Sequence, residues 1–140
     1  MVRRRVLILC TGNSCRSQMA EGWVNHLLSE SWQACSAGTV PAERVHPFAV
    51  RVMAEVGVNI SGQTPRHVAG FVGEPWDVVV TVCDAAKETC PLFPGRVERM
   101  HVSFEDPAAA QGSDEERLGV FRRIRDEIRE RLLPALRDRT

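Results

Sequence analysis

The chain has 140 residues, 44% of them hydrophobic and 26% charged, which is typical of one globular domain covering residues 1–140. Eighteen basic residues balance eighteen acidic ones, so the total charge excludes a generic polyanion binder and favours neither a nucleic-acid nor a membrane partner. No apolar stretch approaches the ~20 residues of a transmembrane helix, and the signal-peptide pattern is missing, so we expect a cytoplasmic protein.

The predicted elements alternate between strands and helices along the chain. Unbroken apolar runs at residues 6–10 and 77–82 predict strands that are buried on both faces of a parallel sheet. In chain order, we predict a strand at 6–10, a helix at 17–28, a weaker strand at 32–36, a helix at 47–56, loops over 57–76, a strand at 77–82, a weaker strand at 97–102 and a flexible loop at 108–112. This order is the βαβ alternation of a doubly wound α/β fold.

The last predicted element is an amphipathic helix that begins with a capping box, Ser113 followed by Glu116. Its apolar residues recur at three- and four-residue spacing and are Leu118, Phe121, Ile124, Ile128 and Leu132. The opposite face carries arginines and acids, with Glu127 and Arg131 in the favourable i,i+4 order. We interpret that face as solvated rather than as a binding patch.

Five cysteines, an odd number, do not suit a disulfide-stapled secreted scaffold, and they indicate thiol chemistry instead. Cys10 is at the junction of a buried strand and a helix, where a turn aims successive N–H groups at one point and forms a socket for a tetrahedral oxyanion. Gly12 supplies backbone freedom, and the fork of Arg16 grips two anion oxygens. The same donors and the Ser17 hydroxyl favour a Cys10 thiolate, so Cys10 is the candidate nucleophile rather than a buried packing residue. The predicted anion cradle consists of Thr11, Gly12, Asn13, Ser14, Cys15, Arg16 and Ser17.

Residues 10–17 resemble the phosphate-binding loop of the low-molecular-weight protein tyrosine phosphatase superfamily. From Val6 to the C-terminal helix the chain is similar to the thioredoxin-coupled arsenate reductase branch of that superfamily. The resemblance implies a single domain with a four-stranded parallel sheet flanked by helices.

Phosphate and arsenate are near-isosteric, so the loop of residues 10–17 would bind either anion. The distinction between a phosphatase and a reductase therefore depends on Cys83 and Cys90. Cys83 ends the second buried strand and should share a sheet edge with Cys10. If residues 84–89 are helical, Cys83 and Cys90 stand ~10 Å apart along the axis, beyond the ~7 Å limit for a disulfide, so pairing requires unwinding.

Resemblance implies that the Cys10 thiolate forms an adduct with arsenate, and that a Cys10–Cys83 disulfide then releases arsenite. The disulfide next moves to Cys83–Cys90, which is reduced by thioredoxin, with thioredoxin reductase and NADPH as the electron supply, or by a similar dithiol protein. Phosphate or sulfate would compete with arsenate, and no tightly bound cofactor is expected.

Asp106, in an Asp-Pro pair, is implied by the resemblance to be the general acid that protonates the leaving oxygen. Ala108 stands where the phosphatases often carry an aromatic residue, which favours a small inorganic substrate.

A metal centre is not predicted, because the cysteine gaps are too wide for a zinc site. Asn13, Glu21 and Ser36 match a potassium site of some related reductases, but residues 63–66 lack the fourth, aspartate ligand. Cys15 and Cys35 are interpreted as packing thiols, and Trp23, Trp32 and Trp76 as core. Two other functions remain open: a phosphatase with vestigial cysteines, and a non-enzymatic thiol sensor of arsenic or oxidants.

Overall fold

The computed structural model describes residues 3–91 and 93–139. In the described chain, four strands form one parallel sheet in the order β2-β1-β3-β4. The strands are β1 (Arg4–Cys10), β2 (Trp32–Gly38), β3 (Val78–Thr81) and β4 (Glu98–His101). The predicted four-stranded parallel α/β fold is therefore confirmed.

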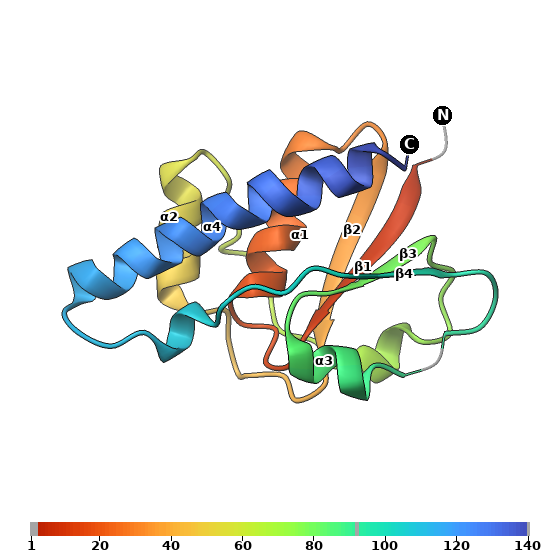
Figure 1. Cartoon of the computed structure of the whole chain (residues 1–140), viewed down its shortest axis with the longest axis horizontal. Coiled ribbons are helices and arrows are strands. Elements are labelled where there is room, and N and C mark those ends of the chain that lie inside the picture. The colour runs from red at the N-terminus through yellow and green to blue at the C-terminus, as the bar shows by residue number, and fades with distance from the viewer. Residues whose placement is uncertain (1–2, 92, 140) are drawn as a thin grey trace.

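Helices alternate with these strands (Figure 1). They are α1 (Arg16–Leu27), α2 (Pro47–Glu55), α3 (Asp84–Thr89) and α4 (Asp114–Arg137), with short 3-10 turns η1 (Val68–Phe71) and η2 (Pro107–Ala109). Helices α1, α2 and α4 pack against one another, whereas α3 lies at the end of the sheet where β1 runs into α1. No described helix is long and apolar enough to cross a membrane.

The core explains why the two apolar runs become the central strands. Val6, Leu7, Ile8 and Leu9 of β1 are fully buried, so both faces of this strand are covered, and β3 is buried in the same way. The predicted bounds are close, but β2 extends to Gly38 and β3 ends at Thr81, two residues before Cys83. The three tryptophans are buried as predicted.

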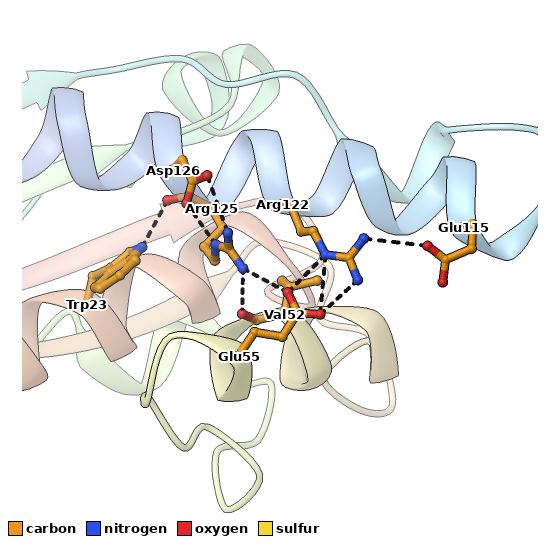
Figure 2. Close-up of polar contacts among 7 residues, drawn as sticks. All are labelled: Trp23, Val52, Glu55, Glu115, Arg122, Arg125 and Asp126. Atoms are coloured by element: carbon orange, nitrogen blue, oxygen red, sulfur yellow. Dashed lines mark hydrogen bonds and ion pairs between the residues drawn. The ribbon is translucent and has the colours of Figure 1, made fainter.

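Helix α4 has the predicted capping box and apolar face, but its polar face is not simply solvated. Arg125 is buried and donates to the Val52 carbonyl and to Glu55 of α2, as Figure 2 shows. Arg131 donates to the Ser103 carbonyl rather than pairing with Glu127. The polar face is solvated along most of its length, as predicted, but not at Arg125, because the Val52 carbonyl and the Glu55 carboxyl group of α2 approach the helix there.

Candidate functional site

The loop between β1 and α1 encloses a cavity of about 200 Å³ at the carboxyl edge of the sheet. Its walls are residues 10–16 together with Asp106 and Ala108 from the segment that follows β4. Six of the seven predicted cradle residues thus line one small cavity, of a size suited to a small oxyanion. Ser17 is the exception: it is fully buried behind the loop.

The Cys10 sulfur is held from two directions. The Asn13 backbone N–H donates to it at 3.2 Å, and the Ser17 hydroxyl lies 2.8 Å from it. The thiol is 2% exposed, so these two groups replace the water that would otherwise solvate a thiolate. The contacts prepare Cys10 to react as a nucleophile from the floor of the cavity.

The bend of the loop is made by Asn13 and not by Gly12. Asn13 has a φ of +50°, in the left-handed region, whereas Gly12 does not adopt a positive φ. The Asn13 amide stabilises this conformation by donating to Ser17 at 2.7 Å and to Ser36 at 3.0 Å. The expectation for Gly12 was wrong because a short polar side chain with buried partners can hold the strained position.

Beneath the loop, a buried amide and hydroxyl network joins α1 to β2 and to residues 64–66. Gln18 donates to the backbone and side-chain oxygens of Asn13 and to the Thr64 carbonyl. Ser36 donates to Glu21, whose pKa is raised by burial and partly lowered again by this hydrogen bond. Sequence reasoning missed Gln18, whose role depends on the close approach of distant residues.

The same network argues against a potassium ion. The Asn13 side-chain oxygen already accepts from Gln18 and from the Arg66 backbone N–H, both at 3.0 Å. The region expected to supply an aspartate supplies a guanidinium instead, and Arg66 acts electrostatically on Glu21. Asn13, Glu21 and Ser36 lie together, but their surroundings do not fit a cation. The described residues contain no cluster of three or more His, Cys, Asp or Glu side chains that could hold a metal.

Gly38, the last residue of β2, lets the loop approach the sheet. A Cβ atom at this position would lie 2.4 Å from the Thr11 carbonyl oxygen, which is closer than atoms can stand. Sequence reasoning did not select Gly38, although a glycine at the end of a strand can signal a close backbone approach.

Arg16 and Asp106 lie next to each other on the wall of the cavity. Arg16 donates to the Phe104 carbonyl at 3.0 Å, and its other terminal nitrogen lies 4.0 Å from an Asp106 carboxyl oxygen. Asp106 also accepts from the Ala108 N–H at 3.0 Å. A cation that can grip an anion and a carboxyl group that can donate a proton therefore share the cavity wall.

Cys83 lies beside the loop, as the shared sheet edge predicts. Its sulfur is 3.5 Å from the Thr11 hydroxyl, and the residue is 5% exposed. Cys83 is the N-cap of α3, and Cys90, half-buried, is the C-cap of the same helix. Both are free thiols, as are the other three cysteines. Because α3 is helical, Cys83 and Cys90 can form a disulfide only if the helix unwinds.

The other two cysteines differ in burial. Cys15 lines the cavity, but burial raises the pKa of its thiol to about 12, which disfavours its ionisation. Cys35 is half-buried in the middle of β2, not at its end, and burial raises its pKa as well.

The fold and the loop define an α/β protein with a thiol at the floor of an oxyanion cradle. Residues 5–138 match the low molecular weight phosphotyrosine protein phosphatase family, and the chain belongs to that family.

Its relatives include reductases. The chain is 48% identical to an arsenate reductase of Halalkalibacterium halodurans over 132 residues, 94% of each chain. A solved arsenate reductase in the phosphate binding state has a TM-score of 0.75 and 31% identity, over 96% of this chain and 98% of that one. A thioredoxin-dependent arsenate reductase of Corynebacterium glutamicum has a TM-score of 0.67 and 28% identity, over 99% of this chain and 64% of that one. The predicted resemblance is confirmed by these matches.

Proposed function

We propose that the protein is an arsenate reductase that uses Cys10, Cys83 and Cys90 in sequence and is regenerated by thioredoxin. The proposal rests on one observation above all. Cys83, the N-cap of the short helix α3 whose C-cap is Cys90, lies against Thr11 of the anion loop. A phosphatase needs no thiol at this place.

In the first step, the Cys10 thiolate attacks the arsenic of an arsenate held by Arg16 and the loop N–H groups. A sulfur–arsenic bond forms, and a hydroxyl group leaves as water after Asp106 gives it a proton. Arsenic remains As(V).

In the second step, the Cys83 thiolate attacks the Cys10 sulfur. The disulfide forms, and the sulfur–arsenic bond breaks with its electron pair staying on arsenic, which becomes As(III) and departs as arsenite. Two thiols are oxidised by the loss of two electrons, which balances the reduction of one arsenic.

In the third step, Cys90 attacks Cys83 and Cys10 is released as a thiolate. Because α3 joins the two cysteines, this step requires the helix to unwind. The Cys83–Cys90 disulfide is then available to the dithiol of thioredoxin.

The test is arsenate-dependent oxidation of NADPH with thioredoxin and thioredoxin reductase supplied. Turnover is expected in the unaltered protein and should vanish in Cys83→Ser and Cys90→Ser, whereas Cys35→Ser, a thiol outside the site, keeps it. Full turnover in Cys83→Ser or in Cys90→Ser would exclude the proposed reaction order from Cys10 through Cys83 to Cys90. A conformational change on oxidation without sustained turnover would indicate a sensor instead.

A second activity, hydrolysis of aryl phosphates, is favoured by the cavity itself, because Cys10, Arg16 and Asp106 are the groups that such a reaction needs. We expect weak hydrolysis that survives Cys83→Ser and Cys90→Ser. Asp106→Asn should reduce it by a factor on the order of 10²–10⁴, the usual contribution of a general acid. Release of p-nitrophenol measures the rate, and an unchanged rate in Asp106→Asn would remove Asp106 from the mechanism.

A further inference from the structure

Strand β4 presents two polar side chains toward the two ends of α3. Arg99 pairs in register with Val79, and His101 with Thr81, so these four residues share one face of the parallel sheet. Together with Cys90 and Met100 they line a cavity of about 350 Å³, separate from the anion cavity. Cys90 thus lies beside residues of β3 and β4 that have no role in the three thiol steps described above.

Arg99 contacts the segment that carries the third thiol. One terminal nitrogen of its guanidinium lies 3.6 Å from the Cys90 sulfur, and the other donates to the Pro91 carbonyl at 3.2 Å. The fork therefore grips the sulfur and the backbone of the following residue at the same time. A lysine could make either contact but could not hold both groups in one plane.

His101 holds the opposite end of the helix. Its ring lies 2.7 Å from the Thr81 hydroxyl and 2.9 Å from a carboxyl oxygen of Asp84, the first residue of α3. The helix that must unwind is thus held by β4 at its beginning, while Arg99 holds the chain just beyond its end. Of these two contacts, only that of Arg99 is with Cys90 itself.

We propose that Arg99 is a positioning residue for the third thiol step, holding Cys90 and stabilising its thiolate for attack on Cys83. The proposal rests on the proposed function, because it assigns a role to the thiol that completes that reaction.

The step is an exchange without net oxidation. The Cys90 thiol first gives its proton to solvent, and its thiolate attacks the Cys83 sulfur of the Cys10–Cys83 disulfide. The Cys83–Cys90 bond forms, the Cys10–Cys83 bond breaks, and the electron pair leaves on Cys10, where the Asn13 N–H and the Ser17 hydroxyl receive it. Arg99 acts at the start of this exchange, where negative charge must exist on Cys90.

The electrostatics of Cys90 agree with this role. Burial raises the pKa of the Cys90 thiol, and the charge and hydrogen bond of Arg99 oppose that rise. The other titratable residue on the cavity wall is His101. Without Arg99, burial acts alone and less thiolate is present at neutral pH.

The first test measures the alkylation rate of Cys90 against pH, resolved from the other cysteines by peptide mass spectrometry on the reduced protein. Arg99→Met keeps the apolar stem and removes the charge, and Arg99→Lys restores a charge without the fork. Arg96→Met removes a charge from an exposed position three residues earlier and is the matched control.

We expect Arg99→Met to slow Cys90 alkylation at pH 7 by about three- to tenfold, which corresponds to a rise of half to one unit in the apparent pKa. Arg99→Lys should recover part of the rate, and Arg96→Met should match the unaltered protein. This test uses no arsenate, so its result does not depend on the proposed reaction.

The second test follows one turnover. Reduced protein is mixed with arsenate, quenched by alkylation, and analysed for the two disulfides. Arg99→Met should form Cys10–Cys83 at the normal rate but convert it to Cys83–Cys90 at least threefold more slowly. If the unaltered protein forms no arsenate-dependent disulfide, the proposed function fails, whereas the alkylation result still decides the role of Arg99.

Two results would overturn the inference. One is an unchanged pH profile of Cys90 alkylation in Arg99→Met with a normal far-ultraviolet circular dichroism spectrum. The other is an equal slowing in Arg96→Met, which would show a general effect of surface charge rather than a contact with Cys90.

Discussion

The direction of the hydrogen bonds around Cys10 follows from a count of donors. The Arg66 backbone N–H can only donate, so the Asn13 atom facing it is the oxygen, and the two hydrogens of the Asn13 amide point to Ser17 and Ser36. Ser17 therefore accepts from Asn13, and its single hydrogen is free for the Cys10 sulfur. The buried network orders the hydroxyl as a donor to the Cys10 sulfur.

This orientation predicts the effect of Ser17→Ala. Losing a hydrogen bond to a charged group costs about 1.5–3 kcal/mol, so we expect alkylation of Cys10 at neutral pH to slow by about 10- to 100-fold. Peptide-resolved mass spectrometry measures the rate. Cys90, alkylated in the same sample, is the internal control and should keep its rate. Equal rates for Cys10 in both proteins would mean that Ser17 is only a packing residue.

At the scale of residues, sequence reasoning placed the groups that lie close together along the chain. Cys10 and Arg16 were selected because they lie on one strand-turn-helix segment, and both line the anion cavity. Gln18 and Gly38 were missed because their roles depend on residues 64–66 and on β2, which approach the loop only in the folded chain. The positive φ of Asn13 could not be predicted, because the partners that hold its side chain are not visible in the local sequence.

At the scale of elements, the end of β2 acts as a platform for the anion loop. The backbone N–H groups of Val40 and Ala42, just after β2, donate to the carbonyls of Thr11 and Gly12. These bonds engage two loop carbonyls with donors that do not line the cavity. Gly38 permits the approach on which the bonds depend.

Gly38→Ala should therefore damage anion binding more than folding. The added Cβ meets a backbone carbonyl that cannot rotate aside, so the loop must move. We expect overpacking to cost about 1–3 kcal/mol of stability and phosphate affinity to fall at least tenfold. Calorimetric titration with phosphate and urea unfolding measure the two effects, and Gly62→Ala, an open position, is the control. Unchanged phosphate affinity would contradict the role of Gly38.

Helices α2 and α4 are joined through the carboxyl group of Glu55, whose charge, and with it the strength of the contact, depends on pH. Glu55 accepts from Arg122 and from the buried Arg125 (Figure 2), and the hydrogen bond from Arg122 is the main cause that lowers the Glu55 pKa below its usual 4.5. A lowered pKa in the folded protein means that the contribution to stability is present above 4.5 and is lost as the pH falls below it.

Glu55→Gln should accordingly destabilise the protein at pH 7 by about 1 kcal/mol, with a smaller difference near pH 3.5. Urea unfolding at the two pH values measures the free energy of unfolding. Glu130→Gln, an exposed acid on α4, is the matched control and should have little effect at either pH. A difference that is equal at both pH values would mean that packing, not charge, joins the helices.

Most elements could be predicted from the sequence because their patterns are local. Apolar runs defined β1 and β3, and the capping box and apolar spacing defined α4. The partners of Arg125 and Arg131 could not be predicted, since they are backbone and carboxyl groups of other elements. The sequence left open whether residues 84–89, which are α3 in the structure, form a helix. Six residues are too few to show a helical periodicity of apolar side chains.

At the scale of the whole molecule, a formal net charge of zero is compatible with an anion site because the relevant charge is local. The cavity of about 200 Å³ is lined by Arg16 and by the loop residues 10–15, and at such short range these groups outweigh the net charge of the whole molecule in an interaction with an anion. The rest of the surface need not be basic, so affinity for an oxyanion should depend on Arg16 rather than on total charge.

Binding at this site should stabilise the folded molecule. A ligand that binds only the folded state at 100 times its dissociation constant adds about 2.7 kcal/mol, which for a chain of this size raises the melting temperature by about 5–10 °C. Phosphate is the probe, because it resembles arsenate but does not oxidise thiols. Phosphate salts also stabilise proteins by exclusion from the surface, so the specific part is the difference from a variant that cannot bind.

That variant is Arg16→Met, and Arg51→Met, which removes a charge from an exposed position on α2, is its matched control. In thermal scans at increasing phosphate, with ionic strength held constant by chloride, the unaltered protein and Arg51→Met should show the full shift. Arg16→Met should keep only the small shift caused by exclusion. If phosphate raises the melting temperature of all three proteins equally, the anion is not held by Arg16, and the cavity enclosed by the Cys10 loop is not the binding site.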